Sequence, residues 1–175
     1  MAARMNLINL RSASIAETWR DYLELTKPRI VALILFTSLV GSLLAAPWPP
    51  RLDTLLYANV GIALAAAGAA VINHVLDSVI DGSMRRTRAR PLPTGRVGKP
   101  QALGFALVLS VASMLLLVRR VNVLTAALTL ASLLGYAVVY TVWLKRTTSQ
   151  NIVIGGAAGA TPPLFCYGAR MSNDK

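Results

Sequence analysis

Long apolar blocks alternate with short polar and basic segments along the whole chain. Each block has roughly 16 to 22 residues, about the length that a helix needs to cross the hydrocarbon core of a bilayer. The blocks cover residues 30–46, 55–76, 102–118, 124–144 and 152–167. This pattern predicts an all-α, polytopic transmembrane helix bundle with about five spans.

The segment before the first apolar block has a different pattern. Apolar residues recur at helical spacing at Ile15, Trp19, Tyr22 and Leu23, which predicts a short amphipathic helix on the membrane surface with the aromatic rings at headgroup depth. The stretch does not resemble a cleaved signal peptide, so the first block is predicted to be a retained span. We therefore expect a cytoplasmic amino-terminal segment over residues 1–29 and a transmembrane domain over residues 30–175.

Composition and charge support this topology. Of the 175 residues, 55% are hydrophobic and 14% are charged, and the net charge is +11. The basic residues lie between apolar blocks, which argues against a soluble nucleic-acid-binding domain and agrees with the positive-inside rule for a cytoplasmic amino terminus. The single cysteine excludes a disulfide within the chain. The predicted cytoplasmic side holds 13 of the 18 basic residues, namely Arg4, Arg11, Arg20, Lys27, Arg29, Arg85, Arg86, Arg88, Arg90, Arg96, Lys99, Lys145 and Arg146.

Three polar residues at the end of the second block form the strongest candidate site. Asn73, Asp77 and Asp81 are spaced four apart, which on a helix places them on one face with neighbouring Cβ atoms about 5–6 Å apart. Carboxylates near a membrane span are costly and usually have a function. Two carboxylates and an amide offer oxygen ligands, which suit Mg²⁺ bound together with a substrate phosphate.

An arginine cluster follows at Arg85, Arg86, Arg88 and Arg90. Guanidinium groups bind phosphate oxygens through paired hydrogen bonds. An acidic pair followed by a basic cluster at a membrane surface predicts a magnesium–diphosphate site for a lipid diphosphate whose apolar tail lies among the helices. The structural alternative is that the two aspartates end the helix and pair with the arginines.

The same residues carry a resemblance to a known family. The pattern from Asn73 through Asp77, Asp81, Met84, Arg86, Thr87 and Arg90 to Pro91-Leu92 resembles the first aspartate-rich motif of the UbiA superfamily of intramembrane prenyltransferases. Three further segments, Leu25–Ile30, Trp143–Arg146 and Asn151–Pro163, are similar to the haem-farnesylating branch of that superfamily, the protoheme IX farnesyltransferases or haem O synthases.

The resemblance implies a reaction and a set of roles. The reaction is the Mg²⁺-dependent transfer of a farnesyl group from farnesyl diphosphate to a vinyl group of haem b, giving haem O for terminal oxidases in the bacterial inner membrane. Asp77 and Asp81 are implied as catalytic residues, and with Asn73 they are implied to bind Mg²⁺ through the diphosphate. The implied diphosphate-binding residues are Asn73, Arg86, Arg90, Lys27, Arg29 and Lys145.

The resemblance also has departures and leaves alternatives open. Ser78 stands where the family often has arginine, and the chain has no second aspartate motif, so we expect it to cover the first half of a nine-helix fold. A related prenyltransferase for an aromatic or quinone precursor is the nearest alternative. A transporter or assembly protein is the alternative from another class. His74, the only histidine, is either a ligand of haem iron or a packing or hydrogen-bonding residue.

Overall fold

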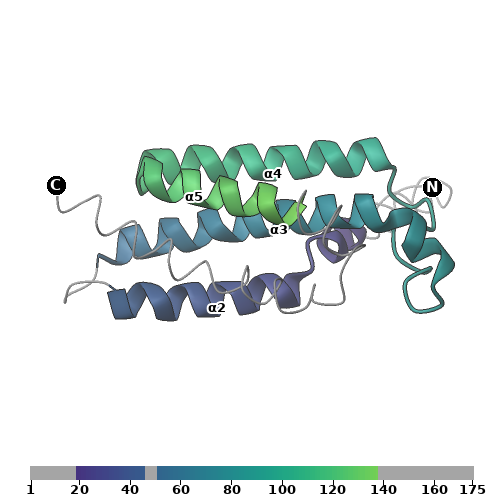
Figure 1. Cartoon of the computed structure of the whole chain (residues 1–175), viewed down its shortest axis with the longest axis horizontal. Coiled ribbons are helices and arrows are strands. Elements are labelled where there is room, and N and C mark those ends of the chain that lie inside the picture. The colour runs from purple at the N-terminus through teal and green to yellow at the C-terminus, as the bar shows by residue number, and fades with distance from the viewer. Residues whose placement is uncertain (1–18, 46–50, 138–175) are drawn as a thin grey trace, which may run out of the picture.

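The structure is a bundle of antiparallel helices. A computed structural model of the chain describes residues 19–45 and 51–137, and every regular element in that part is helical. Consecutive helices from α2 to α5 reverse direction, with α3 between α2 and the layer formed by α4 and α5 (Figure 1). The predicted all-α fold is therefore confirmed. The helices are Trp19–Leu25, α2 Pro28–Ala45, α3 Leu52–Ser83, α4 Lys99–Arg120 and α5 Val123–Leu134.

Two of the described helices, α3 and α4, are long and apolar enough to cross a membrane. A third span results if the helix Trp19–Leu25 and α2, which meet at 51°, count as one bent element. These helices correspond to the first three predicted spans. The fourth predicted span begins as α5, and its remainder lies outside the described residues together with the fifth.

Helix α3 is longer than the sequence predicted. It continues beyond Leu76 to Ser83 and has 32 residues, which corresponds to about 48 Å at 1.5 Å per residue and exceeds the roughly 30 Å core of a bilayer. The apolar block of residues 55–76 therefore predicted the end of this helix seven residues too early. The last turns stay helical because the Thr87 hydroxyl donates to the Asp81 carbonyl oxygen at 2.9 Å, so Asp77 and Asp81 lie on one continuous helix face.

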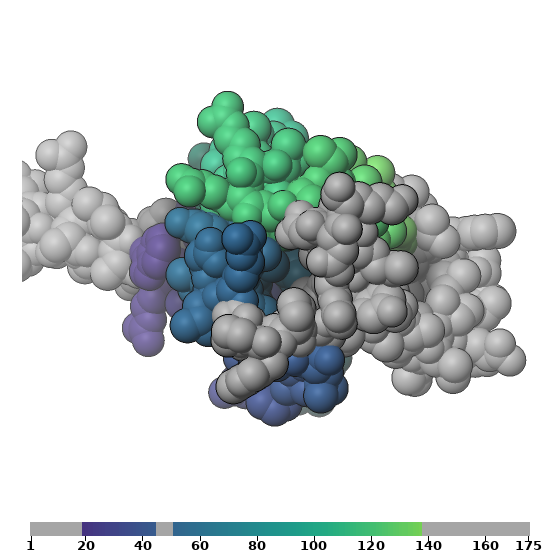
Figure 2. Space-filling view, turned by 90° about the vertical axis from the view of Figure 1, so that its left-hand side faces the viewer, coloured from purple at the N-terminus to yellow at the C-terminus, as the bar shows by residue number. Residues whose placement is uncertain are grey.

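Close contact between α3 and α4 forms the centre of the described bundle. A Cβ atom built on Gly61 would lie 2.5 Å from Leu117 Cδ2, so the glycine permits an approach that alanine would obstruct. The Ser113 hydroxyl on α4 donates to the Gly61 carbonyl oxygen at 2.7 Å. This buried contact fixes the two long helices against each other. Figure 2, which views the end of the bundle opposite the helix Trp19–Leu25, shows α3 between the α4–α5 layer and α2.

The other end of the bundle is covered by two short segments. The helix Trp19–Leu25 and the turns of residues 84–98 meet where α3 ends and α4 begins (Figure 1). Tyr22 packs on Phe105 of α4 with ring centroids 5.0 Å apart. This packing gives the polar end of α3 a fixed set of neighbours. The buried cluster beneath consists of Leu25, Val71, Leu92, Val97, Ala102 and Ala106.

The amino-terminal helix leaves part of its predicted apolar stripe exposed and packs on the bundle mainly through other residues. Trp19 and Leu23, from the predicted apolar stripe, are exposed, whereas Asp21 and Leu25 are buried. The aspartate tolerates burial because Arg96 pairs with it at 2.8 Å. The helix is therefore attached to the protein through this ion pair, the buried Leu25 and the ring contact between Tyr22 and Phe105.

Candidate functional site

Three polar side chains are buried together near the carboxyl end of α3. Asn73, Asp77 and Asp81 are only 4%, 5% and 6% exposed. They lie on one helix face, as their spacing predicted. Burying carboxylates without compensating charges or hydrogen bonds is costly, so the groups that surround this face determine what it can bind.

Lys27 reaches this face from the junction between two helices. Its Nζ donates a hydrogen bond to Asn73 Oδ1 at 2.6 Å. The junction is abrupt because Pro28 is the first residue of α2, a position where a missing N–H does no harm, and the Ile30 N–H bonds to the Lys27 carbonyl oxygen. Lys27 itself has a φ of 52°, a left-handed conformation that costs a non-glycine residue about 1–2 kcal/mol.

Arg90 reaches the same face from the turns after α3. Its Nη1 pairs with Asp81 Oδ2 at 2.7 Å, with the aspartate side chain 8% exposed and the arginine side chain 30% exposed. One part of the structural alternative is therefore observed, since an aspartate does pair with a downstream arginine. The aspartate does not end the helix, however, because α3 continues to Ser83.

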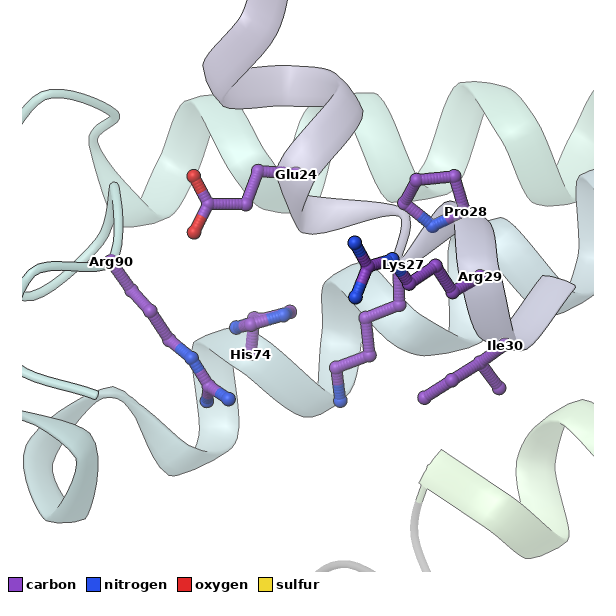
Figure 3. A pocket seen from close by; sticks show the side chains of 7 residues that line it. All are labelled: Glu24, Lys27, Pro28, Arg29, Ile30, His74 and Arg90. Carbon is purple, nitrogen blue, oxygen red and sulfur yellow. The ribbon is translucent and has the colours of Figure 1, made fainter. Parts of the chain in front are cut away.

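A cavity of about 570 Å³ lies beside this acidic face (Figure 3). Lys27, Arg29 and Arg90 contribute three cations to its wall, and Glu24 contributes one carboxylate. Lys27 and Arg90 also contact the acidic face, so they connect it to the cavity. A cavity with this excess of positive charge fits an anionic group such as a phosphate. The remaining lining residues are Pro28, Ile30 and His74.

The predicted diphosphate-binding residues are only partly brought together. Lys27, Arg29 and Arg90 line one cavity. Arg86 is exposed, does not line that cavity and has no ion pair within the described part of the chain. Its contact with diphosphate remains a prediction. Lys145 lies outside the described residues.

Two lining residues were not predicted from the sequence as diphosphate ligands. Glu24 belongs to the polar stretch before the first span, where its helical position gave no sign that it would face Arg90 across a cavity. His74 was predicted to be either an iron ligand or a packing or hydrogen-bonding residue, without a place in a phosphate cavity. Its place beside Lys27 and Arg90 depends on how the helix Trp19–Leu25 turns into α2, and no spacing rule expresses that turn.

The donor atoms on α3 fit magnesium bound with a phosphate ligand. No group of three His, Cys, Asp or Glu side chains in residues 19–45 and 51–137 could hold a metal ion by itself. The acidic face instead offers two carboxylates and the amide of Asn73. Mg²⁺ usually takes one or two carboxylates and completes its shell with water and substrate phosphate, so this set of donors fits the ion when an anion fills the neighbouring cavity.

Comparisons with known proteins agree with this chemistry. The sequence profile described as the UbiA prenyltransferase family matches residues 34–174. The fold is similar to a solved structure from work titled "Structural and mechanistic insights into the biosynthesis of Digeranylgeranylglyceryl phosphate synthase in membranes", with a TM-score of 0.78 and 22% identity over 87% of this chain and 53% of that one.

Two curated relatives are closer in sequence. A protein named protoheme IX farnesyltransferase from Marinobacter nauticus is 58% identical over 167 residues, which are 94% of this chain and 55% of the relative. A protein of the same name from Azotobacter vinelandii is 62% identical over 152 residues, which are 85% of this chain and 50% of the relative. The chain thus spans about half the length of these relatives.

Proposed function

The chain belongs to the UbiA prenyltransferase family, and we propose that it forms the amino-terminal part of an enzyme that farnesylates haem. The donor is farnesyl diphosphate, the acceptor is a vinyl group of haem b (protohaem IX), and the product is haem O. Support comes from the relatives named protoheme IX farnesyltransferase. Because they are about twice as long, the proposal concerns the activity of the whole protein.

One observation carries the proposal. The buried face of Asn73, Asp77 and Asp81 is contacted by Lys27 at one end and Arg90 at the other, and both cations line the adjacent cavity. A magnesium–diphosphate group needs oxygen donors for the metal and cations for the phosphates, side by side. This arrangement supplies both on the residues that the family motif singles out.

The roles follow from the chemistry of an allylic diphosphate. The bond between the allylic carbon and the diphosphate oxygen breaks, and the diphosphate leaves with the electron pair. The terminal vinyl carbon of the acceptor bonds to the allylic carbon, which leaves a cation at the other vinyl carbon. Water adds to that cation and loses a proton, so that the product carries a hydroxyl group. Lys27, Arg29 and Arg90 bind the leaving group and stabilise its developing charge, with Arg86 and Lys145 as further contacts. Mg²⁺ bound through the diphosphate supplies additional charge neutralisation. Asp77 and Asp81, the catalytic carboxylates, hold that group in place together with Asn73.

The membrane setting follows from the same charges. The protein is an integral membrane protein, as the two long apolar helices and the family indicate. We place it in the bacterial inner membrane with residues 1–29 as a cytoplasmic segment and residues 30–175 as a partial transmembrane domain. The basic residues that line the cavity, Lys27, Arg29 and Arg90, then face the cytoplasm. Terminal-oxidase assembly proteins are proposed partners because they would receive the product.

A test in cells examines reaction and site together. A host that lacks its own haem O synthase receives this chain, either alone or joined to the carboxyl-terminal half of the Marinobacter relative. Asp77→Asn is the test variant. Asp53→Asn is the matched control, because this aspartate lies in the first turn of the same helix, at the other end from the site. Extracted haems are then separated and weighed by mass spectrometry.

The expected result is farnesylated haem from the parent and from Asp53→Asn, with none from Asp77→Asn. Farnesylated haem from all three proteins would show that the reaction does not need the acidic face. If the parent chain joined to the carboxyl-terminal half of the relative is present in the membrane but gives no farnesylated haem, the proposal that haem b is the acceptor is contradicted. Incubation of the same membranes with aromatic acid acceptors would then identify the quinone-precursor branch, and inactivity with both acceptor classes would favour a transporter or assembly protein.

A further inference from the structure

His74 lines the cavity, and the described residues leave one of its two ring nitrogens without a hydrogen-bond partner. The side chain is 3% exposed, and its Nε2 atom is buried with no hydrogen-bond partner in the described part of the chain. The imidazole lies between Arg90 and Lys27 in Figure 3. A buried polar atom left without a partner is destabilising, so a partner from outside the described residues is expected to satisfy it.

The surroundings indicate what kind of partner would fit. Lys27, Arg29 and Arg90 give the cavity three positive charges against the single carboxylate of Glu24. A ligand that enters this cavity therefore carries negative charge. An anion also supplies what an imidazole N–H needs, which is an acceptor oxygen, and hydrogen bonds to charged acceptors are stronger than those between neutral groups.

The position of His74 on α3 allows a hydrogen bond to an anion that also contacts the acidic face. It follows Asn73 directly and precedes Asp77 by three residues, so it lies about 100° around the helix from the former and 60° from the latter. Lys27, His74 and Arg90 line one cavity. An anion that contacts the acidic face, Lys27 and Arg90 would therefore also lie next to the imidazole. His74 is not one of the family-motif residues named above.

We propose that His74 donates a hydrogen bond from Nε2–H to an oxygen of the diphosphate group. The inference rests on the proposed function, because it takes the cavity to hold the diphosphate. The imidazole keeps its proton throughout. When the bond from the allylic carbon to the diphosphate oxygen breaks and the electron pair leaves with that oxygen, the hydrogen bond strengthens as the charge grows. His74 then binds the departing diphosphate and stabilises its negative charge.

The single histidine of the chain makes a direct measurement possible. In a chain labelled with ¹⁵N-histidine and reconstituted in lipid nanodiscs, the two ring-nitrogen signals both belong to His74. Inorganic diphosphate with Mg²⁺ is the probe. Binding is expected to move the Nε2 signal and to leave that nitrogen protonated, and Asp77→Asn is expected to abolish the change.

Binding affinity gives the second readout. His74→Leu removes the donor at similar volume and is expected to weaken the affinity for Mg²⁺–diphosphate about 10-fold or more, as for the loss of a hydrogen bond to a charged group. His74→Gln keeps an N–H near the position of Nε2 and is expected to stay within about threefold of the parent. Thr129→Val is the matched control, because it removes another buried polar atom without a described partner, the Thr129 hydroxyl, on α5 and away from the cavity.

The outcomes separate this inference from the proposed function. If Mg²⁺–diphosphate binds and depends on Asp77 while His74→Leu binds like the parent, the role of His74 is wrong and the diphosphate site stands. If the parent does not bind, or binds equally with Asp77→Asn, the proposed site itself fails. A change in the haem absorption spectrum that requires His74 without diphosphate would assign the imidazole to the iron and overturn the inference.

Discussion

Lys27 Nζ lies 2.6 Å from Asn73 Oδ1 and thereby joins the start of α2 to the polar end of α3. The lysine makes this contact from a left-handed backbone conformation, with φ at 52°. A conformation that costs about 1–2 kcal/mol persists only where the neighbouring structure requires it. The following proline at the start of α2 fixes the direction of the chain, so the strain coincides with the residue that links the cavity to the acidic face.

Replacing Lys27 with Met should weaken the binding of Mg²⁺–diphosphate about tenfold, because one charge-assisted contact with the anion disappears. Isothermal titration with inorganic diphosphate measures the loss. Arg20→Met is the matched control, since Arg20 is an exposed cation on the short helix that leads to Lys27 and does not line the cavity. Equal affinities of the two variants would argue against a direct contact between Lys27 and the phosphate.

Arg90 should contribute to stability as well as to binding. Arg90→Met leaves the buried carboxylate of Asp81 without its cation. Breaking a buried pair from one side costs about 3–5 kcal/mol, and the partial exposure of Arg90 puts the expected loss near the lower end, at about 3 kcal/mol. The free energy of unfolding in mixed micelles measures it.

A second substitution separates charge burial from other effects of losing Arg90. Adding Asp81→Asn to Arg90→Met removes the uncompensated charge, so most of the lost stability should return while diphosphate binding stays low. Arg88→Met is the control, because Arg88 is exposed and has no ion pair in the part of the chain that the structure describes. A double variant as unstable as Arg90→Met would contradict this account.

The sequence predicted the acidic face more accurately than the cavity beside it. Asn73, Asp77 and Asp81 share a face because helical spacing places them there, and that rule holds wherever the helix forms. The apolar length of a span also follows from the bilayer. The first three apolar blocks correspond to α2, α3 and α4, of which α3 and α4 are each long enough to span a bilayer. The second block ended seven residues early, since contacts with the segment 84–98 extend α3 beyond it.

The cavity depends on tertiary contacts that no periodicity encodes. Arg86 and Arg90 looked equivalent in the sequence, yet one is exposed and the other binds Asp81. The difference arises from the turns of residues 84–98, whose Leu92 and Val97 are buried and set the direction of the neighbouring arginine. The burial of Asp21 likewise could not be predicted, because it depends on an ion pair with Arg96, which lies 75 positions later in the sequence.

The ion pair between Asp21 and Arg96 should hold the helix Trp19–Leu25 against the bundle. Arg96→Ala leaves the buried aspartate unpaired, so backbone amides of residues 19–26 should exchange hydrogen faster by about tenfold or more, the equivalent of 1.4 kcal/mol of local stability. Hydrogen exchange read by mass spectrometry measures this. Because the helix carries Glu24 at the cavity wall and leads into Lys27, diphosphate binding should weaken with it.

Reversing the pair provides the control for that prediction. Asp21→Arg together with Arg96→Asp restores opposite charges, and the exchange protection of residues 19–26 should recover at least in part. Arg85→Ala, at an exposed cation of the same segment 84–98, should leave exchange unchanged. Slow exchange in Arg96→Ala would mean that Leu25 and the ring contact of Tyr22 hold the helix without the ion pair.

Two glycines of the bundle should respond to alanine with opposite signs. A Cβ on Gly61 would meet Leu117 Cδ2 at 2.5 Å and Cγ at 2.6 Å, whereas a Cβ on Gly104 would meet nothing within 4 Å. Gly61→Ala should therefore destabilise the protein by about 1–3 kcal/mol through overpacking, and Gly104→Ala should stabilise it by up to about 1 kcal/mol through helix propensity. Unfolding in mixed micelles compares the two. Adding Leu117→Ala should return part of the loss in Gly61→Ala, because the clash is with that side chain, and failure of this rescue would place the tight contact elsewhere.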